Sequence, residues 1–390
     1  MAQWIDTSPV TMGIENEEIA SLHKDVREEL NLQSERRDLP CLTMDDVCIQ
    51  SQLGSGSFSE VYSVSILLDS WLDGTIEDNR PATKPKKSSD EIQKCLRPRS
   101  RHSWFRSMSS MSLAPPKYAL KTIRHDFEDD SSIMHMAVKD SYFEAEILAH
   151  LPVHPNLINL VAVSTGYWEN PAKGFLILEK ATETLQYRLV RWRREFKSNK
   201  ALVSSLFQPG KGRRGLMHAQ RSRVESCGVG IARALKFLHQ HGIIYRDLKP
   251  ANIGFGFYDG QIKLFDFGLA RTQRLSDQTS RKLTGNVGTA RYMAPEVTLH
   301  ADYCLPADVF SYAVLLWEIL TLEKPFEGIK DLKQLQNMTV HRHKRPSLRK
   351  ISSPLVKDLL RACWDRDPSA RPTSVLIVKQ VELAAKAEEQ

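Results

Sequence analysis

Nine consecutive residues in the middle of the chain read Ile-Tyr-Arg-Asp-Leu-Lys-Pro-Ala-Asn, from Ile244 to Asn252. The triplet Asp266-Phe267-Gly268 begins fourteen residues after Asn252. Two carboxylates, an amide and a lysine on neighbouring loops are the groups needed to hold a divalent metal ion and to move a phosphoryl group. This pair of motifs decides how the rest of the chain is interpreted.

The two motifs strongly resemble the catalytic loop and the metal-binding loop of eukaryotic protein kinases. The resemblance implies that Asp247 is the catalytic base and that Lys249 neutralises the phosphoryl group during transfer. It also implies that Asn252 and Asp266 bind Mg²⁺. Oxygen ligands on two loops, completed by the phosphates of ATP and by water, suit that ion. ATP and Mg²⁺ are therefore the expected cofactors, and protein hydroxyls are the expected acceptors.

A glycine-rich segment upstream, from Leu53 to Tyr62, has the pattern of a strand, a tight turn and a second strand. Glycine has no Cβ, so backbone N–H groups in such a turn can approach phosphates closely. The segment by itself is equally consistent with a plain hairpin, and Ser59 replaces the third glycine of the kinase pattern. By resemblance, the nucleotide-binding residues here are Gly54, Ser55, Gly56 and Val61.

Lys121 and Ala119 lie two residues apart on a β-rich segment and therefore face the same side of a strand. By resemblance, Ala119 contacts the adenine and Lys121 reaches the α and β phosphates. Glu144 on the following helix is the expected partner of Lys121, whereas Glu146 would point elsewhere on that helix. The alternative is that Lys121 and Glu144 are ordinary solvated charges.

The family pattern also implies several interior contacts. An apolar column should link the two lobes near Asp308, and Leu178 should guard the back of the nucleotide pocket. Glu179 to Ala181 should form the hinge whose backbone binds adenine. The members of the column are Leu148, Leu160, Tyr245 and Phe267, with Tyr245 replacing the commoner histidine.

The segment from Leu269 to Glu296 corresponds to the activation segment of kinases. Glu296 is expected to pair with Arg371 in a buried ion pair. Arg246 is expected to dock a phosphorylated residue of this segment. An upstream kinase would act on Thr284 first, with Thr279 and Ser280 as further candidates, although an exposed hydroxyl in a loop is more often merely solvated.

We expect an α+β fold of two lobes, since 390 residues exceed what one hydrophobic core usually organises. The small lobe should contain a five-stranded antiparallel sheet with one helix, and the larger lobe should be mainly helical. The expected divisions are an acidic extension at 1–45 with a short helix near Glu15 to Leu32, a small lobe at 46–180, a large lobe at 181–380 and a tail at 381–390. Basic insertions are expected at about 73–115 and about 198–222, the second as a loop because Gly210 and Gly212 break helical periodicity.

The net charge of +7 is concentrated in two segments. Residues 80 to 117 carry ten basic and two acidic residues, and residues 191 to 223 carry ten basic and one acidic residue. Because this charge does not follow one recognition helix, we do not expect nucleic-acid binding, although a steep salt dependence would reveal it. The sequence predicts no membrane span, no secretory signal and no zinc site through paired cysteines. We expect a cytoplasmic protein and leave nuclear entry open.

Lys249 in the catalytic loop is typical of Ser/Thr kinases, and the segment from Cys363 to Pro372 resembles the tyrosine-kinase-like branch of that group. Dual specificity stays open. The alternative from another class is a pseudokinase, a scaffold that binds partners without turnover. Its usual mark is loss of the lysine, the base or the metal-binding aspartate, none of which is lost here. Gly254 is the remaining departure, because the family usually places an apolar side chain there beneath the adenine.

Overall fold

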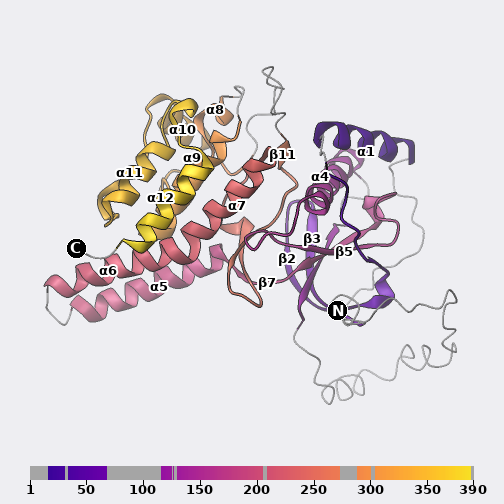
Figure 1. The fold of residues 1–390 in the computed structure, drawn as a ribbon, viewed down its shortest axis with the longest axis horizontal. Coiled ribbons are helices and arrows are strands. Elements are labelled where there is room, and N and C mark those ends of the chain that lie inside the picture. Colours follow the sequence, from indigo (N-terminus) through magenta and orange to yellow (C-terminus); the bar gives the residue numbers. More distant parts are fainter. Residues whose placement is uncertain are drawn as a thin grey trace, which may run out of the picture.

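The computed structural model describes residues 16–30, 34–67, 116–124, 126, 130–204, 209–272, 288–299 and 304–387. These residues form a sheet-containing lobe and a mainly helical lobe, which lie side by side in Figure 1. The expected α+β, two-lobed fold is confirmed. The first basic insertion, expected at 73–115, lies outside the described residues.

The small lobe is built on a six-stranded sheet with the order β1-β5-β6-β4-β3-β2. The five expected antiparallel strands are present, but a sixth strand, β1, pairs in parallel with β5. The sheet of the small lobe therefore begins before residue 46. The sequence did not indicate β1, because a two-residue strand is too short to show an alternating pattern. The strands are β1 (Cys41–Leu42), β2 (Val47–Ser55), β3 (Ser59–Ile66), β4 (Tyr118–Ile123), β5 (Leu160–Ser164) and β6 (Phe175–Glu179).

Two helices accompany this sheet. Helix α4 (Ser131–His150) begins earlier than the apolar pattern after Tyr142 indicates, because Asp130 accepts hydrogen bonds from two N–H groups of the first turn. Helix α1 (Asn16–Leu30) forms where the short helix was expected and packs on α4. The N-terminal extension therefore packs against the small lobe through this helix.

The large lobe is mainly helical, as expected. Helix α9 is buried from Ala307 to Leu320 and forms the centre of the lobe. The elements of this lobe are the helices and strands that follow Glu179 in the chain. They are β7 (Ala181–Thr184), α5 (Leu185–Ser204), α6 (Pro209–Arg223), α7 (Val229–Gln240), β8 (Ile243–Ile244), β9 (Ile253–Gly256), β10 (Ile262–Leu264), β11 (Arg271–Thr272), α8 (Pro295–Thr298), α9 (Pro306–Thr321), α10 (Leu332–Gln336), α11 (Pro354–Cys363) and α12 (Ser374–Lys386).

The expected loop insertion at about 198–222 is wrong in its secondary structure, because α5 and α6 cover most of it. Tertiary contacts made further along α6 outweigh the cost of the glycines near its start. The Gln220 amide donates to the carbonyl oxygen of Lys350 at 2.6 Å, and Arg221 Nε donates to that of Ala385 at 2.8 Å. The expected tail at 381–390 is also wrong up to Lys386, since α12 continues and buries Val381.

A membrane-spanning helix was not expected, and the described part of the chain contains none that is long and apolar enough to cross a bilayer.

Candidate active site between the two lobes

Lys121 on β4 is held by two carboxylates. Its Nζ lies 2.5 Å from Oε2 of Glu144 on α4 and 3.0 Å from Oδ1 of Asp266. The Lys121 and Glu144 side chains are only 14% and 1% exposed, so they are not ordinary solvated charges. The predicted pairing of Lys121 with Glu144 is present, and it brings β4, α4 and the Asp266 loop together.

The charges in this cluster support one another. Burial of the Lys121 ammonium opposes its charge, but Asp266 and Glu144 more than offset that effect, so the pKa of Lys121 is raised. Lys121 in turn holds the pKa of the Asp266 carboxyl below its ordinary value, against the effect of burial. The cluster therefore presents an ammonium and a carboxylate in their charged forms.

The Asp247 carboxylate is the centre of a second cluster, in the loop after β8. Lys249 Nζ lies 2.5 Å from its Oδ2, and Asn252 Nδ2 donates to the same oxygen at 2.9 Å. The backbone N–H and the hydroxyl of Thr289 both donate to its Oδ1 at 3.1 Å. The sequence analysis assigned no role to Thr289; the only available signal was its place directly after Gly288 in the segment that ends at Glu296.

Gly288 allows Thr289 to reach this position. Its φ is +109°, and a Cβ there would lie 2.7 Å from the carbonyl oxygen of Arg246. Only glycine fits such a backbone conformation and such a close approach. The backbone at Gly288 can therefore lie directly against the catalytic loop.

The catalytic loop is anchored by the buried carboxylate of Asp308. Asp308 accepts the N–H of Tyr245 at 2.8 Å and the N–H of Arg246 at 2.9 Å, and its Oδ2 lies 3.0 Å from His239 Nε2. Arg246 has a φ of +74°, which is unusual for a residue with a side chain, so these bonds hold a strained backbone in place. The expected anchoring near Asp308 is present.

The apolar column expected from the family pattern lies in one continuous core. The Tyr245 and Phe267 rings meet edge to face with centroids 5.4 Å apart, and the Tyr245 hydroxyl donates to the carbonyl oxygen of Phe265 at 2.5 Å. Leu148 and Leu160 are buried in the same core. Tyr245 thus provides both aromatic packing and a hydrogen bond to the segment that carries Asp266.

A cavity of about 240 Å³ joins the two charged clusters. The turn between β2 and β3 forms one wall of it, and Lys121, Asp247 and Asp266 line the others. Of the predicted glycine-loop residues only Gly56 lines this cavity. The other predicted nucleotide-binding residues lie outside its lining and belong to β2, β3, β4, β6 and β7: Gly54, Ser55, Val61, Ala119, Glu179 and Ala181.

The expected hinge follows Leu178 and is anchored on both sides. The N–H of Glu179 donates to the carbonyl oxygen of Asn159 at 2.9 Å, and its side chain pairs with Lys263 at 3.1 Å. Lys180 Nζ donates to the buried hydroxyl of Ser63 at 2.9 Å. The connection between the lobes is therefore tied to both of them.

Gly254 has a packing reason. A Cβ at this position would lie 2.6 Å from the Cβ of Ala181 and 3.2 Å from the Phe265 ring. The two strands approach each other here, since Gly254 on β9 pairs with Thr184 on β7. The methyl group of Ala181 in the hinge takes the space that a side chain at position 254 would need. Glycine at this position is therefore required by the packing against Ala181.

Asp140 on α4 was missed by the sequence analysis although it also lines the cavity. Burial raises its pKa to about 6, the nearby Asp266 acts in the same direction, and Arg271 and Lys121 oppose the shift. Asp140 carries no family motif, and only the packing of α4 against the Asp266 loop reveals it.

The end of the activation segment has the expected geometry. Arg371 donates to Glu296 with both terminal nitrogens, at 2.6 and 2.9 Å, and the Arg371 side chain is fully buried. The predicted ion pair is confirmed. The candidate phosphorylation sites Thr279, Ser280 and Thr284 lie outside the described residues.

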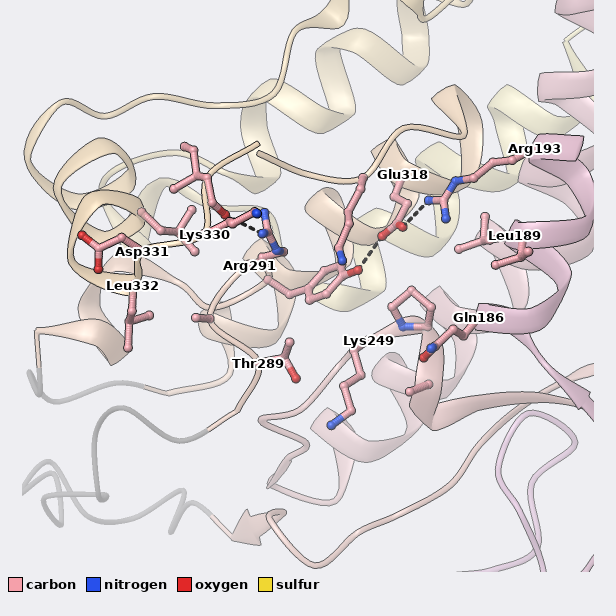
Figure 2. Close-up of a pocket in the computed structure, with 18 residues that line it drawn as sticks. Gln186, Leu189, Arg193, Lys249, Thr289, Arg291, Glu318, Lys330, Asp331 and Leu332 are labelled. Carbon is pink, nitrogen blue, oxygen red and sulfur yellow. Dashed lines mark hydrogen bonds and ion pairs between the residues drawn. The ribbon is translucent and has the colours of Figure 1, made fainter. Parts of the chain in front are cut away.

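A second cavity of about 520 Å³ opens beside Lys249 and Thr289 on the large lobe. Figure 2 shows Lys249 and Thr289 between two walls: Gln186, Leu189 and Arg193 on one side, and Arg291, Asp331 and Leu332 on the other. Arg291 donates to the carbonyl oxygens of Pro325, Phe326 and Ile329 at 2.6 to 2.8 Å and so shapes the second wall. We call this cavity the large-lobe groove.

The charged clusters thus meet at a cavity between the two lobes of the fold. A family model described as the protein kinase domain matches residues 114–382, which is more than half of the chain. The chain therefore belongs to the protein kinase domain family, as its motifs predicted. The matched range begins after the glycine-rich turn, so Gly54, Ser55, Gly56 and Val61 lie upstream of it.

Several kinases are similar to this chain. The serine/threonine-protein kinase STY17 of Arabidopsis thaliana is 39% identical over 153 residues, which cover 39% of this chain and 26% of the relative. The dual specificity protein kinase shkB of Dictyostelium discoideum is 37% identical over 147 residues, covering 37% and 22%. Mitogen-activated protein kinase kinase kinase 7 of Drosophila melanogaster is 30% identical over 225 residues, covering 58% and 29%. The matches thus span less than a third of these relatives, which are of the expected tyrosine-kinase-like type.

Proposed function

We propose that this protein is a Ser/Thr protein kinase that transfers the γ-phosphate of ATP to hydroxyl groups of proteins. The observation that carries the proposal is the Asp247 carboxylate, held by Lys249, Asn252 and Thr289 at the edge of the cavity that also contains Lys121 and Asp266. A base, a cation beside it and a buried cation across the cavity are the parts that phosphoryl transfer needs. The presence of all of them argues against the pseudokinase alternative.

The side chains divide the work as follows. Asp247 orients the acceptor hydroxyl and takes its proton, and Lys249 neutralises charge on the phosphoryl group in transit. Lys121, kept protonated by Glu144 and Asp266, holds the α and β phosphates. Bound Mg-ATP supplies the phosphoryl group and the metal charge.

Asn252 and Asp266 are suited to hold the Mg²⁺. The Asn252 amide nitrogen is committed to Asp247, which leaves its oxygen as the side-chain atom for a cation. Asp266 is charged and its side chain is 47% exposed. Phosphate oxygens of ATP and water would complete the coordination of the ion.

The deciding experiment is phosphate transfer from Mg-ATP to a generic protein substrate. The wild type is compared with Asp247→Asn and Lys121→Met, and with the matched surface controls Asp358→Asn and Lys333→Met, whose side chains are exposed on α11 and α10. We expect activity in the wild type and both controls and its loss in the first two variants. Equal signals from all five proteins would overturn the proposed kinase activity and favour the pseudokinase alternative.

The large-lobe groove supports a proposal about the substrate: acceptor sites flanked by acidic residues. Its acidic members are already engaged. Glu318 is buried, accepts from Arg193 at 2.6 Å and from the Tyr292 hydroxyl at 2.5 Å, and Asp331 caps α10. Lys324 and Lys330 line the groove with exposed side chains that form no close ion pair with a carboxylate among the described residues, and Lys324 lies near enough to Glu318 to favour its charged form. Their charge favours acidic segments.

Charge reversal tests this substrate preference. Phosphorylation of an acidic and a basic peptide around the same serine is compared for the wild type, for the double variant Lys324→Glu/Lys330→Glu and for the control Lys333→Glu, which lies on α10 outside the groove lining. We expect the double variant alone to lose its preference for the acidic peptide, mainly through KM. A preference that is unchanged would remove the groove from substrate selection while leaving the kinase activity intact.

We also propose that an upstream kinase regulates the enzyme at Thr284, Thr279 or Ser280. Arg246 next to the catalytic Asp247 supplies a guanidinium suited to a phosphate. Similarity to a mitogen-activated protein kinase kinase kinase makes a place in a kinase cascade reasonable. Alanine at Thr284 should lower activity after activation in cells, and an unchanged activity of the triple alanine variant would contradict the proposal.

A further inference from the structure

Helix α1 covers the side of α4 that faces away from the candidate active site, and Figure 1 shows the two helices next to each other on the small lobe. Four apolar residues of α1 recur at helical spacing and are buried in the core that contains α4. They are Ile19, Leu22, Val26 and Leu30, none more than 4% exposed. The helix is thus docked along a stripe and not only at one end.

A buried carboxylate of α4 is bound by the segment around α1. Arg36 donates to both oxygens of Glu146, at 3.1 and 2.7 Å, and Arg27 donates to one of them at 3.2 Å. Arg37 continues the connection by donating to the carbonyl oxygen of Leu148 at 2.7 Å. A fully buried carboxylate requires such partners, so α4 in this position depends on the arginines.

Glu29 at the end of α1 reaches the loop on the other side. Its Oε1 lies 3.0 Å from Arg271 Nε, and its carbonyl oxygen accepts from the Thr272 hydroxyl at 2.6 Å. Arg271 Nη1 then donates to the carbonyl oxygens of Gly268 and Ala270, both at 2.8 Å. A continuous set of bonds therefore runs from α1 to the Asp266-Phe267-Gly268 loop.

We propose that residues 16–30 and 34–37, which we call the N-terminal clamp, hold α4 and the segment after Gly268 in the arrangement needed for catalysis. Glu29 and Arg36 are positioning residues in this scheme: they touch neither nucleotide nor substrate, but they fix the helix that carries Glu144 and the loop that carries Asp266. The proposal rests on the kinase activity proposed above. It gives the acidic N-terminal extension a function as an intramolecular activator.

The two anchored elements explain why the clamp acts on turnover. Lys121 bridges Glu144 on α4 and Asp266 on its loop, so a shift of either element breaks one side of the bridge. The clamp contacts both elements from outside the cavity and none of its residues lines that cavity. Its loss should therefore lower kcat and leave binding of the peptide substrate little changed.

The test uses the full chain with Glu29→Gln. The matched control is Glu28→Gln, because the Glu28 side chain is exposed and lies 4.0 Å from Lys24. We expect Glu29→Gln to lower kcat by about tenfold with an unchanged KM for the peptide, and Glu28→Gln to behave as the wild type. A double-mutant cycle with Arg271→Gln should show that the two losses are not additive. Equal kcat values for Glu29→Gln and Glu28→Gln, or fully additive losses, would overturn the clamp.

A second readout does not depend on phosphate transfer. Hydrogen exchange of the α4 amides should become faster in Arg36→Gln and Glu29→Gln but not in Glu28→Gln, at a temperature where each variant is folded. Should the wild type lack kinase activity, this measurement still decides whether the clamp holds α4. Unchanged protection of α4 in both clamp variants would overturn the proposal, whatever the outcome of the kinase assay.

Discussion

Helix α4 carries two buried glutamates two residues apart, and they serve opposite faces. Glu144 turns toward the cavity and pairs with Lys121, whereas Glu146 turns toward the N-terminal clamp and pairs with Arg36 and Arg27. Two residues correspond to about 200° around a helix, so the two carboxylates cannot share partners. The same residue type in the same helix thus belongs to a reacting site on one face and to a supporting contact on the other.

The difference lies in what each partner is available to do. Lys121 is a single ammonium that also faces the cavity, where a phosphate can share it. Arg36 is engaged by both oxygens of Glu146 and is stacked on the Trp168 ring at 4.1 Å, so it has little left for a ligand. We therefore expect changes on the cavity face to act directly on turnover. Changes on the clamp face should act on stability and, through the position of α4, indirectly on turnover.

The largest effect is expected from removing the cation on the cavity face. Lys121→Met should lower kcat/KM by roughly 10³-fold, because Lys249, the other lysine among the described residues that line the cavity, is held at Asp247. Steady-state kinetics with a peptide substrate measure this, with Lys333→Met as the control. A loss smaller than tenfold would place Lys121 among the structural charges and remove the contrast between the two faces.

Exchanging each glutamate for glutamine separates the two faces directly. Glu146→Gln should lower the free energy of unfolding by about 3 kcal/mol, because two guanidinium groups lose their buried counter-charge. Glu144→Gln should change stability less, since Lys121 keeps Asp266, but should lower kcat by about 10²-fold. Urea unfolding and kinetics on both variants supply the measurements, and the reverse pattern would contradict the assignment of faces.

Arg36→Lys tests whether the geometry of the clamp matters beyond its charge. Lysine keeps the positive charge but cannot bind both oxygens of Glu146 while stacking on Trp168. We expect a loss of about 1 kcal/mol in the free energy of unfolding. Chemical denaturation checks it against Lys24→Arg on the exposed face of α1; a variant as stable as the wild type would reduce the contact to simple charge pairing.

The smallest effect concerns the pH dependence of stability and involves Asp140, which lines the cavity beside Glu144 on α4. Burial raises the pKa of Asp140 from 3.8 to about 6, so the folded state binds more protons than the unfolded state between these values. The stabilising contribution of the protonated carboxyl is therefore lost as the pH rises from about 4 to about 6. Asp140→Asn should gain stability relative to the wild type as the pH rises through this window, by an amount on the order of 1 kcal/mol near pH 5. Thermal unfolding at several pH values measures it, and parallel pH profiles would contradict it.

Much of the cavity face could be predicted from the sequence. The partners Asp247, Lys249 and Asn252 lie within one short run, and their chemistry shows in the residue types themselves. Strand alternation places Ala119 and Lys121 on one face, and the resemblance to kinases implied the pairing of Lys121 with Glu144. The prediction of a loop at 198–222 was wrong, because the glycines there interrupt the helical periodicity of the sequence. The contacts that stabilise the helix, from Gln220 to Lys350 and from Arg221 to Ala385, involve distant segments of the chain.

The sequence alone therefore determined the family, the two-lobed fold and the identity of the charged groups around Asp247 and Asp266, because these depend on short runs of residues with a fixed chemistry. Only the tertiary structure decided that Thr289 reaches Asp247, that Ala181 accounts for Gly254, and that α1 binds the back of α4. Arg27 and Glu146 are 119 residues apart. A contact of that range leaves no periodic signal, and it forms because a buried carboxylate needs a cation wherever the folded chain supplies one.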